Sequence, residues 1–386
     1  MTSPVHRRHE APGASRAGMH TWDASLATGR APHVRMNVDL VHRARTMLLA
    51  LLPCALLGIV NTGHQTHLAM ADQGLTRAAD WRGAVLHLAG LDPDPSSLIA
   101  CALHGLLYLL PLLAASAAAA VLSERVFARA RHRELLPGVS VTVLLFVLSV
   151  PPTLPLWQAA LGIAFGVIVG KEVFGGTGRN VFHPALTGLV FLYFAYPSSL
   201  RSDAVWTAVE GFRPMDGVHA AAAGGIAALE SAGATWWRSF VGHQPGALGD
   251  TSAIGCLLGA AFLLHRRLVS WRTLLAMVIG LVVAISVLPE AEALSFQGVP
   301  WYWHATLGSF AFGTVFFATD PVSGAGTNAG RWIHGGLVGA LVAVIRVASP
   351  VHAEGTVLAL LLGSVFAPLI DDIVVRVHIW RRQRRG

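Results

Sequence analysis

Long apolar runs recur along this 386-residue chain and restrict what it can fold into. They lie at 46–61, 98–123, 139–170, 184–196, 252–265, 272–288, 304–318, 332–348 and 355–370. About 20 apolar residues cross a bilayer, and shorter runs tilt, pair or re-enter. Only 13% of the residues are charged, against about 25% in soluble domains. Because PPTLP breaks the 139–170 run, we expect two spans there and about ten in an all-α polytopic membrane protein.

Arginines and lysines cluster beside the apolar runs. The clusters lie in the N-terminal arm, at 123–136, at 265–272 and in the tail at 381–385. By the positive-inside rule these clusters and both termini are cytoplasmic, and 197–251, with few basic residues, is an extracytoplasmic loop. We therefore expect a cytoplasmic arm (1–45), a transmembrane domain (46–370) and a cytoplasmic tail (371–386). This topology explains the net charge of +7 and disfavours nucleic-acid binding, which needs a basic patch on a soluble domain.

Two polar decapeptides interrupt the apolar pattern at matching places. KEVFGGTGRN (171–180) follows WQAALG (157–162) and an apolar run, and TDPVSGAGTN (319–328) follows WHATLG (303–308) and another. The decapeptides align Glu172 with Asp320, Gly176 with Gly324, Gly178 with Gly326 and Asn180 with Asn328. The match indicates a duplicated transmembrane unit, with repeats at about 46–200 and 252–370. Whether the repeats are parallel or inverted stays open.

A glycine-rich acidic segment at membrane depth indicates a broken helix. Freed backbone groups are tolerated there only where they line a cavity or contact a ligand. Gly176 and Gly178 would allow positive φ and a close approach to that ligand. We predict that the two decapeptides face each other and build one central site. The alternatives are that the glycines only allow close helix packing and the acids only pair with Lys171 or Arg179, or, less favoured because the GxGxxG and Walker patterns are absent, a phosphate-binding loop.

Cysteines and histidines form no pattern that is typical of a metal centre or a disulfide framework. Cys54, Cys101 and Cys256 lie singly in apolar runs and are interpreted as small core residues. No HxxxH or HExxH pattern falls in a span. We therefore predict no complete catalytic site within the chain, so that any redox chemistry belongs to a bound flavin and to partner subunits.

Several stretches carry a family resemblance. Residues 150–197 and 301–332, together with HVRMNVDL (33–40), VGHQPGALGDTSA (241–253) and FAPLIDDIVV (366–375), resemble the NqrB/RnfD family of membrane subunits, closely the B subunit of the sodium-translocating NADH:quinone oxidoreductase. The resemblance implies a duplicated ten-helix fold similar to urea and ammonium channels. It also implies a multi-subunit complex of the bacterial inner membrane that couples electron transfer from NADH to quinone with outward sodium movement. In that family an FMN is joined by a phosphoester to a threonine, and riboflavin is associated with the same membrane subunits.

The flavin-attachment stretch is where the chain departs from this family. The family pattern reads DGxSGATAL, and a gap-free pairing with residues 205–229 puts Asp216 at the position of the threonine. An aspartate has no hydroxyl for a phosphoester, and its charge repels phosphate. Thr235 lies nearby in SAGAT, but the following WWRSFVG matches a later family segment. We predict that covalent FMN is absent and that any FMN or riboflavin is bound noncovalently.

Other candidate cofactor residues come from the same resemblance. Asn180 is retained in the family's GTGxN loop, whereas His183 replaces the second asparagine of its NxxNP pattern. A histidine there can hydrogen-bond a flavin edge or simply pack at a helix start. The aromatic FLxFAYP segment can contact flavin or quinone, or can be core. The candidate set is therefore Gly176, Gly178, Asn180, His183, Phe191 and Tyr193.

Carboxylates in or beside the spans are few, and each is a candidate for a cation pathway or a helix-end charge. Hard cations prefer carboxylate and carbonyl oxygens. Glu172 and Asp320, which the duplication aligns, are the strongest candidates. Glu124 stands beside Arg125 and favours an interfacial ion pair, although the resemblance implicates its position in ion uptake. Asp371, next to Asp372 in the last span, completes the set.

Two functions remain from the sequence. The first is a membrane subunit of an Nqr/Rnf-type complex that transfers electrons through flavin and couples them to sodium or another cation, with the other subunits, quinone and lipid as partners. The second is a channel-like or scaffold membrane protein of the same fold that has lost covalent flavin and redox function.

Overall fold

A computed structural model describes residues 40–384 except 76–77, 79, 133–137, 202–204, 210–215, 289–295, 297 and 350–353. The described residues are helical or irregular, with no strand among them, which confirms the predicted all-α class. Most of the predicted arm, 1–39, lies outside the described residues.

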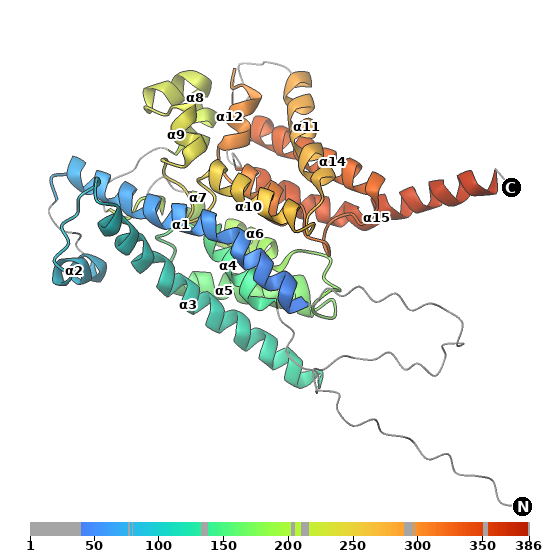
Figure 1. The fold of residues 1–386 in the computed structure, drawn as a ribbon, viewed down its shortest axis with the longest axis horizontal. Coiled ribbons are helices and arrows are strands. Elements are labelled where there is room, and N and C mark those ends of the chain that lie inside the picture. Colours follow the sequence, from blue (N-terminus) through green and yellow to red (C-terminus); the bar gives the residue numbers. More distant parts are fainter. Residues whose placement is uncertain are drawn as a thin grey trace, which may run out of the picture. The chain divides into compact units, whose positions relative to one another are not determined.

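The helices follow the predicted apolar runs closely, and their order is shown in Figure 1. They are α1 (Leu40–Asp72), α2 (Trp81–Leu88), α3 (Leu98–Ala130), α4 (Val139–Leu148), α5 (Leu156–Val167), α6 (Pro184–Ala195), α7 (Ser198–Arg201), α8 (Gly217–Ser231), α9 (Trp236–Val241), α10 (Ala253–His265), α11 (Trp271–Val287), α12 (Trp301–Thr306), α13 (Phe310–Phe312), α14 (Asn328–Ala348) and α15 (Thr356–Gln383). Two π-helical segments, Ile168–Glu172 and Gly313–Phe317, continue α5 and α13.

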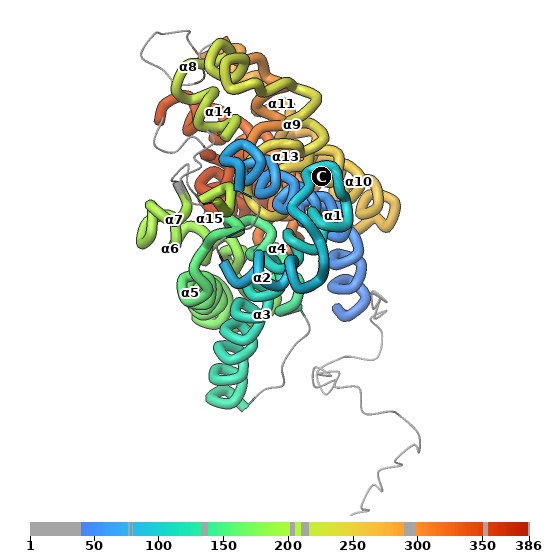
Figure 2. The backbone as a smooth tube through the Cα atoms, turned by 90° about the vertical axis from the view of Figure 1, so that its left-hand side faces the viewer, coloured from blue at the N-terminus to red at the C-terminus, as the bar shows by residue number. Residues whose placement is uncertain are grey.

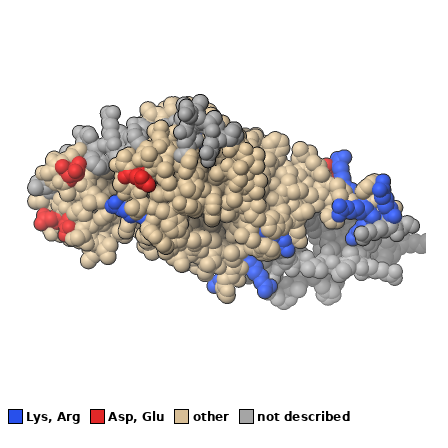
Figure 3. All heavy atoms as spheres, turned by 90° about the horizontal axis from the view of Figure 1, so that it is seen from above, with Lys and Arg blue, Asp and Glu red and all other residues tan. Residues whose placement is uncertain are grey.

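Among the described residues, α1, α3, α14 and α15 are long and apolar enough to cross a membrane. Four more apolar helices, α4, α6, α10 and α11, are shorter. Figure 3 shows a broad surface with few charged side chains on one face, with most of the visible acidic side chains toward one end and most of the basic ones toward the end where α15 finishes. The chain is therefore a membrane protein of several spans, and the count of ten stays a prediction.

Helix boundaries differ from the predicted domain limits at both ends. α1 already includes residues 40–45, and α15 runs through 371–383. Arginine is a good helix former, and α15 continues past Pro368 into the charged residues, so nothing ends either helix where the charge begins. The break at PPTLP is present as predicted, between the end of α4 at Leu148 and the start of α5 at Leu156.

Glycines let neighbouring helices pack with their backbones in contact. α1 and α3 lie side by side in Figures 1 and 2, and a Cβ added to Gly63 of α1 would come within 1.9 Å of the Cys101 carbonyl oxygen of α3. α11 and α14 pack in the same way, since a Cβ on Gly339 would meet the Met277 carbonyl oxygen at 2.0 Å. Small residues of this kind are typical of membrane helix interfaces.

The 197–251 segment, predicted as a loop, contains α7, α8 and α9. α8 kinks at Gly224 and Gly225, and Gly225 takes a φ of 62°. After α9 the chain returns to the bundle, where the Leu248 and Gly249 amides donate to the Val150 and Leu148 carbonyls at the C-terminal end of α4.

Candidate functional site

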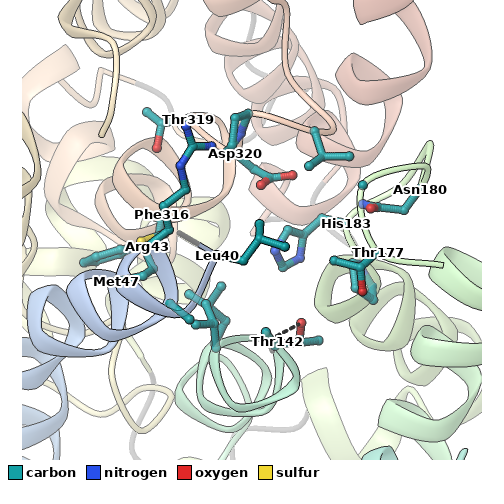
Figure 4. Close-up of a pocket in the computed structure, with 18 of the residues that line it drawn as sticks. Leu40, Arg43, Met47, Thr142, Thr177, Asn180, His183, Phe316, Thr319 and Asp320 are labelled. Atoms are coloured by element: carbon teal, nitrogen blue, oxygen red, sulfur yellow. Dashed lines mark hydrogen bonds between the residues drawn. The ribbon is translucent and has the colours of Figure 1, made fainter. Parts of the chain in front are cut away.

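Residues of both decapeptides line a single pocket of about 210 Å³. Thr177, Gly178 and Asn180 come from the first decapeptide, and Thr319 and Asp320 from the second. Figure 4 shows the Asp320 carboxylate and the His183 ring pointing into the space between the two decapeptides. α1, α4 and the residues after α10 close the pocket with Leu40, Arg43, Met47, Thr142, Leu145, Leu268 and Val269.

A π-helical segment leads into each decapeptide: Ile168–Glu172 includes the first two residues of the first decapeptide, and Gly313–Phe317 ends just before the second. A π-helical turn replaces i→i+4 hydrogen bonds and is a frequent mark of functional sites. The runs that begin at WQAALG and WHATLG therefore carry the same irregularity and end at the same pocket. This correspondence supports the proposed duplication of the two segments.

The first decapeptide turns on its glycines. Gly175, Gly176 and Gly178 have φ values of 115°, 94° and 85°. These values lie in the left-handed region, where residues with a Cβ are strained. The Asn180 side chain donates to the Phe182 carbonyl at 3.1 Å, and the Arg131 guanidinium donates to the Glu172 carbonyl at 2.7 Å. The loop is thus held from both ends.

The turn of the second decapeptide is stabilised by hydrogen bonds to two carboxylates. Gly324 and Gly326 are not among the described residues with positive φ. Asp320 accepts hydrogen bonds from the Ser323 amide at 3.0 Å and from the Ser323 hydroxyl at 2.7 Å. Asp371 of α15 accepts from the Gly326 amide at 2.6 Å and from the Thr327 amide and hydroxyl at 3.0 and 2.6 Å. Side-chain acceptors therefore shape this turn, whereas positive φ shapes the first decapeptide.

Two buried polar atoms of the pocket lack a hydrogen-bond partner within the described part of the chain. They are Arg43 Nε and His183 Nδ1. Buried polar groups are nearly always hydrogen-bonded, so these two nitrogens are available to a molecule bound in the pocket. His183 also packs edge-on against Phe317, with ring centroids 5.0 Å apart.

The predicted cation carboxylates lie in different surroundings. Glu124 forms a buried ion pair with Lys171, which differs from the expected pairing with Arg125 because the fold brings Lys171 to it from the first decapeptide. Glu172 lies 3.8 Å from Arg131, and Asp372 pairs with Arg376 at 2.7 Å on the surface. Asp371 anchors the second decapeptide. Of the four candidates, Asp320 lines the pocket.

Phe191 and Tyr193 lie among core side chains and are not among the residues that line the pocket. Phe191 stacks on Phe165 with centroids 4.3 Å apart and an interplanar angle of 19°. Aromatic stacking between helices is sufficient to explain that position.

Asp216 caps α8. Its carboxylate accepts from the His219 amide at 2.7 Å and contacts His219 Nδ1 at 2.8 Å. Asp216 and Gly217 also match the Asp-Gly that opens the family pattern DGxSGATAL, and in that register the threonine position falls on Ala222, inside α8. The pairing of Asp216 with the threonine is therefore one of two registers, and both lack a hydroxyl.

A second cavity, of about 570 Å³, lies beside α8 and α9. Thr235 and Arg238 line it, and the Thr235 hydroxyl oxygen caps α9 by accepting from the Arg238 amide at 3.4 Å.

Arg43 is the pocket residue that sequence reasoning missed. The sequence places it in the basic arm, whereas the structure has it in the first turn of α1, where it lines the pocket with the decapeptides. Its position just before an apolar run was the available signal, since a basic residue at a span start either faces lipid headgroups or turns inward.

Comparison with known proteins identifies the family. The model of the NQR2, RnfD, RnfE family matches residues 27–379. The chain is 44% identical over 359 residues to the B subunit of the Na(+)-translocating NADH-quinone reductase of Azotobacter vinelandii, covering 92% of this chain and 89% of that one. It is also 44% identical over 360 residues to the corresponding protein of Pseudomonas aeruginosa, with the same coverage, and 42% identical to that of Chromohalobacter salexigens, covering 92% and 86%. The chain belongs to the NQR2, RnfD, RnfE family.

Proposed function

We propose that this chain is a membrane subunit of an Nqr/Rnf-type complex, which passes electrons from NADH to quinone and couples them to the movement of sodium or another cation. The observation that carries the proposal is the pocket between the two decapeptides, with its orphaned Arg43 and His183 nitrogens and the Asp320 carboxylate. The names of the relatives support it, because each is the B subunit of a Na(+)-translocating NADH-quinone reductase.

The residues of the pocket fit a noncovalent flavin ring, as FMN or riboflavin. Arg43 Nε can donate to a ring carbonyl, Asp320 can accept from a ring N–H, and His183 Nδ1 can do either. Leu145, Val322 and Phe316 supply apolar walls for the ring faces. When bound, the flavin supplies the electron-transfer chemistry, and the chain holds, orients and desolvates it. A quinone head group is the second candidate, since its carbonyls would accept from Arg43 and His183, although it has no N–H to donate to Asp320, which already accepts from Ser323.

Covalent FMN does not fit this chain at the family's attachment position. Asp216 and Ala222, the two residues that alignment can place there, carry no hydroxyl. Thr235 stands outside both registers and caps α9. The flavin of this chain is therefore noncovalent.

The proposed setting is the bacterial inner membrane, with ten spans in a duplicated broken-helix fold and both termini in the cytoplasm. The basic residues in the last turn of α15 support one orientation, with the C-terminal end of α15 on the cytoplasmic side.

The test replaces the native gene in its own membrane complex by variants and measures sodium-stimulated NADH:quinone reduction in membrane vesicles. Asp320→Asn removes the pocket carboxylate, and Asp372→Asn removes a carboxylate that pairs only at the surface. We expect loss of sodium-stimulated activity in the first variant and near-native activity in the second. Unchanged activity after deletion of the whole gene would instead favour the scaffold or channel function.

A further inference from the structure

A second polar cluster lies at the other end of α1 and α3, where α2 and the residues after it cover the two helices. His67 of α1 and His104 of α3 are buried, with 0% and 1% of their surface exposed. His67 Nε2 and His104 Nδ1 are 3.0 Å apart. His67 Nδ1 lies 3.2 Å from the Asp94 carbonyl oxygen. The two rings therefore form one hydrogen-bonded chain that ends on backbone.

The partners fix the protonation pattern of this chain of rings. A carbonyl oxygen only accepts, so His67 Nδ1 carries a hydrogen and donates to Asp94. His67 Nε2 is then the acceptor, and His104 Nδ1 carries the hydrogen that it receives. Because a neutral imidazole carries one hydrogen, His104 Nε2 then carries none and its lone pair is free. Cys101 Sγ, 3.5 Å from His67 Nδ1, does not alter this order, because its own hydrogen can point to the Asp94 or Pro95 carbonyl at 3.7 Å.

His104 Nε2 is buried and has no hydrogen-bond partner among the described residues. His104 lines a cavity of about 20 Å³ beneath α2, which also borders His87 and Asp92. A cavity of about 10–15 Å³ holds one water, provided that polar partners surround it. His87 and Asp92 are exposed on their outer side, so a water in this cavity lies between solvent and the bare nitrogen.

We propose that His104 Nε2 is a proton-binding site, loaded from solvent through a single water beneath α2. Protonation leaves the His104 Nδ1 to His67 Nε2 hydrogen bond intact, and the proton belongs to the hydrogen-bonded pair rather than to one ring. A second proton would place two cations side by side, so the pair holds one.

Charges of both signs lie near this pair of rings. The titratable and charged groups that face the pair from the neighbouring elements are Asp80, Arg82, His87, Asp92, Asp94 and Tyr108, with His64 one turn before His67 on α1. Burial raises the pKa of Asp80, but the Gly83 amide and the Arg82 side chain outweigh it and hold that pKa below its usual value. Asp80 is therefore an anion near the pair. It accepts from the Tyr108 hydroxyl at 3.3 Å and pairs with Arg82 at 3.0 Å.

The experiment uses the full chain in lipid nanodiscs with ring-¹⁵N histidine, observed by NMR across a pH series. At high pH we expect a bare Nε2 and a protonated Nδ1 on His104, and on acidification we expect the Nε2 signal to shift to the protonated position while the protein stays folded. His104→Asn is the matched variant, because its amide nitrogen replaces Nδ1 as the donor to His67 and removes Nε2. The titrating signal should be lost in it.

Asp92→Asn serves as a second variant that leaves both rings in place. It should keep the tautomer and the titration and slow only the exchange with solvent. A hydrogen on His104 Nε2 at high pH, or a bare Nε2 that never takes a proton before the protein unfolds, would overturn the proposal. Both of these NMR outcomes are measured on the unmodified chain, so they test the proposal even if a variant does not insert into the membrane.

Discussion

Gly178 takes a backbone conformation that residues with a side chain rarely adopt, with φ of 85°. Nothing lies within 4 Å of a Cβ added there, so only backbone strain opposes a substitution. We expect Gly178→Ala to lower the free energy of unfolding by about 1 kcal/mol. Gly336→Ala is the matched control, because it lies inside α14 and its Cβ would meet its nearest atom at 3.9 Å. It should be neutral or stabilising by up to about 1 kcal/mol. Thermal unfolding in detergent would contradict this account if the two variants behaved alike.

Asp371 and Asp372 are adjacent in sequence but have different interaction partners. Asp371 accepts three hydrogen bonds from Gly326 and Thr327, whereas Asp372 pairs with Arg376 on the surface. Asp371→Asn should cost about 1–3 kcal/mol, because at least one amide of the second decapeptide loses its acceptor. Asp372→Asn should cost less than about 1 kcal/mol. Chemical unfolding of both variants measures the difference, and equal costs would show that Asp371 does not anchor the decapeptide.

At the scale of elements, the ion pair between Lys171 and Glu124 joins the first decapeptide to α3. Both side chains are buried, with 8% and 5% exposed. Lys171→Met leaves Glu124 unpaired and should cost about 3–5 kcal/mol, whereas adding Glu124→Leu should recover much of that loss. Arg376→Met breaks an exposed pair and is the control, with an expected cost below about 1 kcal/mol. Unfolding measurements in which the double variant is worse than Lys171→Met would contradict a simple paired role.

The elements were predictable from the sequence to the extent that they follow local patterns. The apolar runs and PPTLP indicated the helices and the break before Leu156, and the glycines of the first decapeptide indicated its positive φ values. The tertiary partners were not predictable. Asp371 meets Gly326 across 45 positions of sequence, and Lys171 meets Glu124 across 47. Such pairs depend on how helices pack, which no local pattern specifies.

At the scale of the whole molecule, the orientation in the membrane can be tested with reporters. The basic end of α15 predicts a cytoplasmic C-terminus, and the turn between α8 and α9 predicts an extracytoplasmic site. A periplasm-active reporter fused after Gly386 should give no signal, whereas the same reporter inserted at the exposed Ala232 should be active. The reverse pattern would invert the topology, and activity at both sites would place the ends of α15 and α8 on the same side.

A noncovalent flavin between the two decapeptides is the feature on which the proposed function depends most. The direct measurement denatures the purified protein, passes it through a filter that retains the chain, and records flavin fluorescence in the filtrate and in the retained band. We predict fluorescence in the filtrate, a dark chain under ultraviolet light, and a marked loss of filtrate flavin in His183→Leu but not in Phe191→Leu. Fluorescence that stays with the chain would show a covalent flavin, and a dark filtrate together with a dark chain would show that this pocket holds none.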